Sequence, residues 1–382
     1  MSGLLIVPGL RREDVAPPPP RTLPTGVPVM LGYATNGPVE AAVAVRRRED
    51  LARIFGEPAR GYLTAAVGAF FANGGERCHV IRLQDAAAAP AALARGLAVA
   101  RDVDDADLVC APDVVRPRYA PGQPALEPDP VEVAVMQHAL LEHCETLGTR
   151  VAVLDALPNA SPVEVRDQAA ALRSTHGALY YPWPAGDGGA WMPPSGHVAG
   201  AISHVDRTLG VHRAPANVAL EGVRDLERGI DDATQALLRE SGVNCLRAFP
   251  GRGIRIWDAR TLAREPEWSQ LNVRRIVSTL ARWIAMSTRD LAFEPNVPET
   301  WERLRRALIA HLDDLFRQGA LAGASADEAY AVHCDERTNP PELRAAGRMA
   351  VEVLLAPAAP IEVVAVRIVR HAAGVTVEPV TV

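Results

Sequence analysis

The stretch Gly242-Val-Asn-Cys-Leu-Arg-Ala-Phe-Pro-Gly-Arg-Gly-Ile-Arg-Ile-Trp-Asp-Ala-Arg-Thr-Leu262 predicts two strands joined by a tight turn. The first strand covers residues 244–249. The second covers residues 254–259, where successive side chains alternate with the period of two typical of a strand. Between them, Pro250 fixes φ, and Gly251 and Gly253 can adopt backbone conformations that a side chain would forbid. The stretch contains no nucleophile, metal cluster or phosphate-binding loop, so it directs attention from catalysis to assembly.

Composition is that of a globular protein with a large core. The chain has 382 residues, 48% of them hydrophobic, and a net charge of −6. This length favours two lobes. The charge gives no reason to expect a nucleic acid or an anionic membrane as partner. Apolar runs fall short of the roughly 20 residues that span a bilayer, so direct membrane insertion is not expected.

The cysteines and the absence of lysine argue against several classes of protein. Five cysteines are widely spaced and odd in number, which argues against a disulfide framework and favours a reducing cytoplasm. All 40 basic residues are arginine. The absence of lysine excludes a Walker A lysine, a Schiff-base lysine and the kinase lysine. A GC-rich coding sequence explains this usage, although arginine also suits geometry-specific interface pairs.

Strand and helix patterns alternate from residue 27 onward and predict a mixed α/β fold. The expected strands cover residues 27–34, 78–83, 107–111, 150–155 and 178–182, and helices lie between them. This order is typical of an α/β lobe with a largely parallel sheet. The acidic residues Asp102, Asp104, Asp105 and Asp107 are interpreted as a solvated loop.

The C-terminal part combines longer helices with strands. A helix over residues 272–290 has an apolar stripe, with Arg274, Arg275 and Arg282 on its remaining surface. A second helix is expected over residues 298–318, and strands over 349–355 and 361–369. We therefore expect an N-terminal arm (1–25), a first α/β domain (26–235), a C-terminal α/β domain (236–370) and a C-terminal extension (371–382).

Both chain ends resemble strands, and the polyproline run at 17–20 holds the first one away from the body. Unpaired strand edges are a hazard unless something covers them. The hypothesis is that neighbouring copies exchange these strands by β-augmentation; the alternative is that the ends have no fixed structure. The residues expected to carry the exchange are Leu4, Leu5, Ile6, Val7, Val364, Val366 and Ile368.

Residues around the opening stretch are expected to anchor the C-terminal domain or its contacts with neighbours. They are Arg252, Arg255, Trp257 and Arg260. The alternative for the arginines is a set of internal salt bridges.

No catalytic, metal or cofactor site emerges from the motifs. His138, His143 and Cys144 share a helix, but their spacing does not place them on one face as a zinc helix requires. Gly251-Arg-Gly253 lacks the third glycine and the following helix of a dinucleotide fingerprint. No catalytic residue, metal ligand or cofactor is therefore expected.

Many segments resemble the tail sheath family of contractile phage tails and related contractile injection systems. The resemblance covers residues from about 27 to 370 and includes the opening stretch. Its other segments are Val29-Met-Leu-Gly-Tyr-Ala-Thr-Asn-Gly-Pro38, Phe70-Phe-Ala-Asn-Gly-Gly-Glu-Arg-Cys-His-Val-Ile-Arg82, Tyr180-Tyr-Pro-Trp183, Pro193-Pro-Ser-Gly-His-Val-Ala-Gly200, Val211-His-Arg-Ala-Pro-Ala-Asn217, Asn272-Val-Arg-Arg275, Phe293-Glu-Pro-Asn296, Arg317-Gln-Gly-Ala-Leu321 and Cys334-Asp-Glu-Arg-Thr-Asn-Pro-Pro341.

The resemblance implies a structural subunit without enzymatic activity. Family members stack hexameric rings around an inner tube and contract to drive that tube through a membrane. Partners would be further copies of the chain, the tube, the baseplate and a terminator or cap protein. The resemblance also implies that residues 26–235 form the outer domain and that residues 236–370 form the inner, tube-facing domain. Asp335 and Asn339, in the last segment above, join the expected anchors of this inner domain. Assembly would take place in the bacterial cytoplasm, and the product would be a phage tail or phage-tail-like particle.

Two alternatives remain. One is a minor or baseplate-proximal sheath paralogue, and the other is an α/β enzyme that uses the parallel sheet. The N-terminal arm is more polar than the valine- and tyrosine-rich strand of the family, which leaves its pairing residues open.

Overall fold

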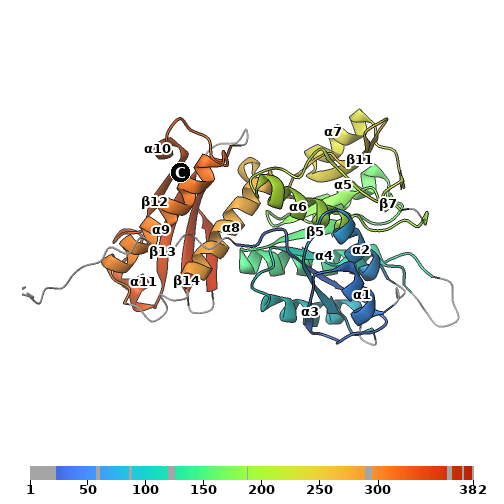
Figure 1. The fold of residues 1–382 in the computed structure, drawn as a ribbon, viewed down its shortest axis with the longest axis horizontal. Coiled ribbons are helices and arrows are strands. Elements are labelled where there is room, and N and C mark those ends of the chain that lie inside the picture. Colours follow the sequence, from blue (N-terminus) through green and yellow to red (C-terminus); the bar gives the residue numbers. More distant parts are fainter. Residues whose placement is uncertain are drawn as a thin grey trace, which may run out of the picture.

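Two β-sheets organise the chain, with helix α8 between them (Figure 1). The computed structural model describes residues 23–56, 61–85, 88–118, 125–186, 188–288, 295–358, 364–371 and 374–380. The mixed α/β architecture predicted from the sequence is confirmed: a large, mostly parallel sheet is followed by a smaller antiparallel one.

The larger sheet has nine strands in the order β2-β3-β1-β4-β5-β6-β10-β11-β8. The six strands from β3 to β10 in this order are parallel, whereas β2, β11 and β8 are antiparallel to their neighbours. The strands are β1 (Pro28–Gly32), β2 (Ala42–Val45), β3 (Cys78–Arg82), β4 (Leu108–Cys110), β5 (Val151–Asp155), β6 (Gly177–Tyr181), β8 (Val218–Ala219), β10 (Val243–Phe249) and β11 (Gly253–Ile256). The short strands β7 (Pro184–Ala185) and β9 (Asp225–Leu226) pair separately.

Helices cover both faces of this sheet, which explains why its central strands β1, β4, β5 and β6 are buried along their whole length. In β1, Val29 and Leu31 contribute to one core and Met30 to the other, because successive side chains point to opposite faces. One face packs against α1 (Arg48–Phe55), α2 (Leu63–Ala72) and α6 (Ser195–Leu209). The other packs against α3 (Ala89–Arg101), α4 (Pro130–Leu147), α5 (Pro162–Ala171) and α7 (Asp232–Glu240).

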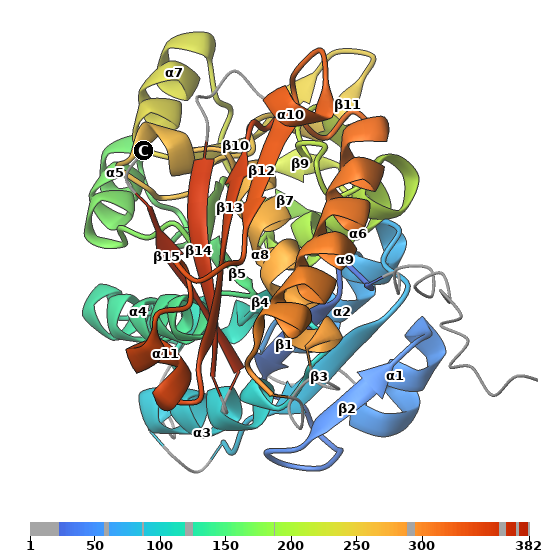
Figure 2. The same cartoon turned by 90° about the vertical axis from the view of Figure 1, so that its left-hand side faces the viewer.

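The smaller sheet is antiparallel, in the order β12-β13-β14-β15, and Figure 2 shows its strands side by side. Its strands are β12 (Tyr330–His333), β13 (Met349–Leu355), β14 (Val364–His371) and β15 (Gly374–Pro379). Its helices are α8 (Leu271–Ser287), α9 (Pro298–Arg317), α10 (Ala326–Ala329) and α11 (Pro341–Ala345). The apolar stripes of α8 and α9 form one core with β12 to β15, which includes the fully buried Trp301 and Leu308.

The predicted hairpin around Pro250 is present, but it belongs to the larger sheet. β10 pairs in parallel with β6, and β11 folds back antiparallel to β10. The expected boundary at residue 236 groups this hairpin with the C-terminal part, whereas its hydrogen bonds join it to the first sheet. Local alternation predicts a strand and cannot tell which sheet supplies its partner.

One expectation is corrected by the structure. Asp107 does not lie in a solvated loop, since it is buried at the start of β4. The expected C-terminal extension contains the strand β15, which pairs with β14 of the same chain. The two segments are joined closely enough for hairpin pairing, with His371 opposite Gly374.

The described residues give no sign of disulfide bonding or of membrane-spanning helices. All five cysteines are unpaired and buried. Within the same part of the chain, no helix has the length and apolar content to cross a bilayer.

Glycines in α6 permit a close approach to α2, and this generates a stability prediction. A Cβ added at Gly200 would lie 2.4 Å from the Phe70 carbonyl oxygen and 2.8 Å from the Cβ of Asn73. We expect Gly200→Ala to lower the free energy of unfolding by about 1–3 kcal/mol, because backbone must move. Urea denaturation measures this change.

Gly68→Ala is the matched control within α2. The nearest atom to its added Cβ is the Arg48 Nε at 4.0 Å. This variant should gain about 0.5–1 kcal/mol from reduced freedom of the unfolded chain. Equal stabilities of the two variants would contradict the close-packing argument.

Candidate assembly surfaces

The β10–β11 hairpin carries a stacked cluster of arginine and aromatic side chains, here called the hairpin cluster: Arg247, Phe249, Arg252 and Trp257. The ring centroids of Phe249 and Trp257 are 4.5 Å apart. The guanidinium carbon of Arg247 lies 5.3 Å from the Phe249 centroid and 5.9 Å from that of Trp257. Arg252 lies 5.8 Å from the Phe249 centroid. These cation–π contacts stiffen the hairpin.

Two of the predicted anchor arginines, Arg252 and Arg255, donate hydrogen bonds to neutral groups of Asn217. Arg255 donates from Nε to the Asn217 side-chain oxygen at 2.9 Å and from Nη2 to the Asn217 carbonyl at 3.0 Å. Arg252 donates to the same side chain at 3.2 Å. Within the described residues, neither arginine has a carboxylate partner. Burial lowers the pKa of Arg260, and the nearby Arg239 adds to this effect. The proposed anchor role of all three stays a prediction.

Arg275 in α8 joins the two sheets through two buried carboxylates, a contact called here the Arg275 joint. Its Nη1 donates to Asp206 Oδ1 at 2.6 Å, and its Nη2 donates to Asp107 Oδ2 at 2.8 Å. The side chains of Arg275, Asp107 and Asp206 are 2%, 5% and 1% exposed. A charge buried this deeply is tolerated only when it is paired and hydrogen-bonded.

The two carboxylates respond differently to this environment. Burial acts to raise the pKa of Asp107, but the attraction of Arg275 and Arg282, together with hydrogen bonds from Arg275 and the Gly26 N–H, outweighs burial and holds that pKa below its usual value. At Asp206, burial prevails and raises the pKa. Burial disfavours the charge of Arg275, yet the attraction of both carboxylates raises its pKa.

The same joint holds the segment that leads to the N-terminal arm. The Asp107 carboxylate accepts hydrogen bonds from the backbone N–H of Gly26 at 3.1 Å and of Val27 at 2.7 Å. One pair of carboxylates therefore ties together the large sheet, α8 and the start of β1. The sequence argument missed this site because it assigned Asp107 to a solvated loop. The available signal was the row of arginines on the otherwise apolar helix α8.

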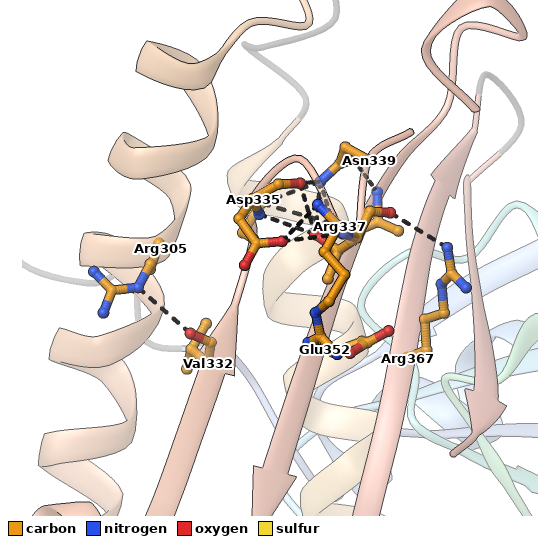
Figure 3. A network of polar contacts seen from close by, with 10 residues as sticks. Arg305, Val332, Asp335, Arg337, Asn339, Glu352 and Arg367 are labelled. Carbon is orange, nitrogen blue, oxygen red and sulfur yellow. Dashed lines mark hydrogen bonds and ion pairs between the residues drawn. The ribbon is translucent and has the colours of Figure 1, made fainter. Parts of the chain in front are cut away.

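Asn339 closes the loop between β12 and β13 (Figure 3). It is fully buried, donates from Nδ2 to the Ala350 carbonyl at 2.9 Å, and accepts from the Ala350 N–H at 2.8 Å. Asp335 turns the loop by accepting from the N–H groups of Arg337 and Thr338, both at 3.0 Å. Both predicted residues thus fix a loop of the smaller sheet from within.

Charged side chains flank this loop. Arg337 pairs with Glu352 at 3.0 Å, and Arg367 of β14 donates to the Thr338 carbonyl at 3.3 Å (Figure 3). The loop is therefore tied to both β13 and β14.

The residues predicted to exchange strands are only partly described. Leu4, Leu5, Ile6 and Val7 lie outside the described residues. Val364, Val366 and Ile368 are buried in β14, which pairs with β13 on one side and β15 on the other. β14 therefore offers no free edge in this arrangement, and exchange at these positions would require β15 to leave first. The strands at the edges of this sheet are β12 and β15.

Asp155 is buried at the carboxyl end of β5, next to which α/β enzymes often bind ligands. Asp155 accepts from the Ser195 N–H at 2.7 Å, and burial raises its pKa to about 7. Tyr181 and Trp183 donate to backbone carbonyls nearby, at 2.9 and 2.8 Å. The small void beside Asp155 has no volume that water could occupy. Nowhere among the described residues do three His, Cys, Asp or Glu side chains gather into a metal-binding group.

The Arg275 joint predicts a strong dependence of stability on one side chain. We expect Arg275→Met to lower the free energy of unfolding by about 3–5 kcal/mol, because two buried carboxylates lose their cation. Chemical denaturation measures this, and the triple variant with Asp107→Asn and Asp206→Asn should recover part of the loss. Arg53→Met, at a position 72% exposed, is the control and should change stability by no more than about 0.5 kcal/mol. If Arg275→Met has the same free energy of unfolding as the wild-type chain, the Arg275 joint does not stabilise the fold.

The Asn339 loop gives a second stability prediction. Asn339→Ala removes the acceptor of the Ala350 N–H and leaves the Ala350 C=O with the weak Cys334 S–H donor, whose sulfur lies 3.6 Å away. We expect a loss of about 1–3 kcal/mol in the free energy of unfolding, the cost of a buried group that loses its hydrogen bond. The exposed Glu336→Ala is the control in the same loop. Thermal denaturation of both variants tests this, and similar melting temperatures would count against a structural role for Asn339.

Family models match the second half of the first lobe and the C-terminal part. Residues 133–262 match the phage tail sheath protein central domain, and residues 263–370 match the phage tail sheath C-terminal domain. The boundary between these matches falls between β11 and α8. A search of curated protein sequences found no significant match.

Solved structures similar to this chain include sheath proteins of contractile particles. A chain of the anti-feeding prophage helical sheath in the contracted state is 27% identical, with a TM-score of 0.73 over 94% of this chain and 98% of that one. A chain of the contracted sheath of the extracellular contractile injection system PVC is 26% identical, with a TM-score of 0.71 over 94% and 96%.

Two further structures extend this likeness. A chain of the anti-feeding prophage baseplate is 27% identical, with a TM-score of 0.75 over 94% of this chain and 97% of that one. The sheath tail protein of Desulfitobacterium hafniense shares the fold at 9% identity, with a TM-score of 0.66 over 96% and 100%. With both sheath domains matched over more than half of its length, this chain belongs to the contractile tail sheath family.

Proposed function

We propose that this chain is a structural subunit of a contractile sheath that surrounds an inner tube. The observation that carries the proposal is the match to sheath chains over 94% of the sequence, across both sheets. Subunits would stack as hexameric rings, and contraction would drive the tube through a target membrane. The role is that of a scaffold, without enzymatic activity.

The two lobes would have different positions in the sheath. We place the tube-facing inner domain at residues 263–370, after the β10–β11 hairpin. This revises the boundary expected at residue 236, because the hairpin is hydrogen-bonded into the larger sheet. The nine-stranded lobe would face outward.

Strand exchange at the smaller sheet would connect neighbouring subunits. In this proposal β15 is the exchangeable strand, since it lies at an edge and pairs only with β14. A neighbour's strand can make the same backbone hydrogen bonds, so the swap costs little. The apolar residues 4–7 would pair at an edge of a neighbour's sheet by the same principle.

The free energy of contraction would come from additional surface buried between subunits. The extended sheath would be a kinetically trapped state. Each additional Å² of apolar surface buried on contraction contributes about 25 cal/mol before ordering and desolvation costs. Exchanged strands would keep subunits linked while their rigid bodies rotate.

A baseplate-proximal sheath paralogue is the second candidate. Two of the similar structures are baseplates of the anti-feeding prophage, one of them contracted. In either role the partners would be further copies, the tube, the baseplate and a cap protein. Assembly would take place in the bacterial cytoplasm before the particle acts.

Removal of the N-terminal arm tests the proposal. We expect a variant that lacks residues 1–20 to remain a folded monomer that forms no sleeves, because residues 4–7 can no longer pair with a neighbour's sheet. Negative-stain microscopy of the full chain, co-expressed with its tube protein, should show striated sleeves that shorten. Normal sleeves from the shortened chain would refute the role of the arm, and a full chain that stays monomeric would refute the sheath function.

A further inference from the structure

An acidic groove with an apolar floor lies between α4 and α5. Its volume is about 560 Å³. Val133, Leu157 and Leu172 are among the residues that form its floor, and Glu127 and Asp167 are exposed at its rim. A third rim carboxylate, Glu164, also accepts a hydrogen bond from the Ser161 N–H at 2.7 Å.

The charged residues that line this groove are all acidic. Arg228, which lies outside the lining, attracts Glu164. The ion pairs of the described part of the chain include none of the three rim carboxylates. An apolar floor with an acidic rim suits an apolar or aromatic segment flanked by arginine.

The tip of the β10–β11 hairpin has the complementary chemistry. It combines Phe249 and Trp257 with the exposed Arg252 and the partly exposed Arg255, which have no carboxylate partner among the described residues. A Cβ built at Gly251 or Gly253 would meet nothing within 4 Å, so the turn projects into open space. Aromatic residues and arginine are the types most enriched at interface hot spots.

The tip and the groove lie apart on one chain. In Figure 2, β11 and the α4–α5 pair are on opposite sides of the larger lobe. A contact between the two surfaces therefore requires a second copy. Because the two surfaces differ, the contact is heterologous, the type that generates rings or helical polymers.

We propose that the hairpin tip of one copy docks into the α4–α5 groove of a second copy, with Arg252 against the acidic rim and the aromatic pair toward the apolar floor. This contact deepens the proposed function and rests on it, since it names one of the interfaces of the polymer. A second copy is the expected occupant of the groove, because the same chain carries both a cationic tip and an acidic groove.

A charge exchange tests the contact. Arg252→Asp and Asp167→Arg should each reduce the fraction of chain in sleeves by at least about tenfold, because like charges then face each other. Together they should restore sleeves to nearly the wild-type fraction. Arg53→Asp, on the distant helix α1, is the control and should assemble normally. Circular dichroism of each variant reports folding separately from assembly.

Disulfide trapping gives an independent test without charge reversal. Chains with Gly251→Cys are mixed with chains with Ala171→Cys, assembled and oxidised. A disulfide-linked pair that contains both variants supports the contact, whereas neither variant alone should form it.

The outcomes separate this contact from the sheath function. If the wild-type chain forms sleeves but the cysteine variants form no disulfide-linked pair, the proposed contact is wrong and the sheath function stands. The same holds if the double charge variant does not restore sleeves. A wild-type chain that forms no sleeves with its tube protein overturns both.

Discussion

The ion pair of Arg275 with Asp107 and Asp206 is the interaction on which the arrangement of the two sheets depends. α8 packs its apolar face into the smaller sheet and presents Arg275 to the larger one. Removing either side would leave charge in a dry interior, where it costs far more than at the surface. The joint also holds Gly26 and Val27, so the start of β1 is fixed by the same carboxylates. The Arg275 joint therefore connects two sheets that have separate hydrophobic cores.

A subunit of a contracting polymer needs rigid bodies and durable links between them. The nine-stranded sheet contributes rigidity, since helices cover both of its faces. The smaller sheet has edges: within the described residues, β15 is paired with one strand and β14 with two. In the proposed exchange, β15 is therefore the strand that would pair with a neighbouring copy. The hairpin cluster adds a projection on the larger lobe.

Local patterns predicted individual elements well and their partners poorly. The strand at 349–355 coincides with β13, and the hairpin around Pro250 was expected within a few residues of its observed bounds. Both depend on alternation and turn chemistry, which act over short distances. The sheet to which the hairpin belongs depends on β6, more than 60 residues earlier in the chain. The burial of Asp107 depends likewise on Arg275, 168 residues away.

The sequence by itself determined the α/β class, the apolar stripes of α8 and α9, and membership of the sheath family through its motifs. Only the tertiary structure decided that Arg252 and Arg255 bind Asn217 in the larger lobe, that Asn339 holds Ala350, and that Val364, Val366 and Ile368 lie inside a sheet. The reason is physical. Periodicity and turn residues are properties of neighbours in the chain, whereas ion pairs and strand partners are set by long-range packing.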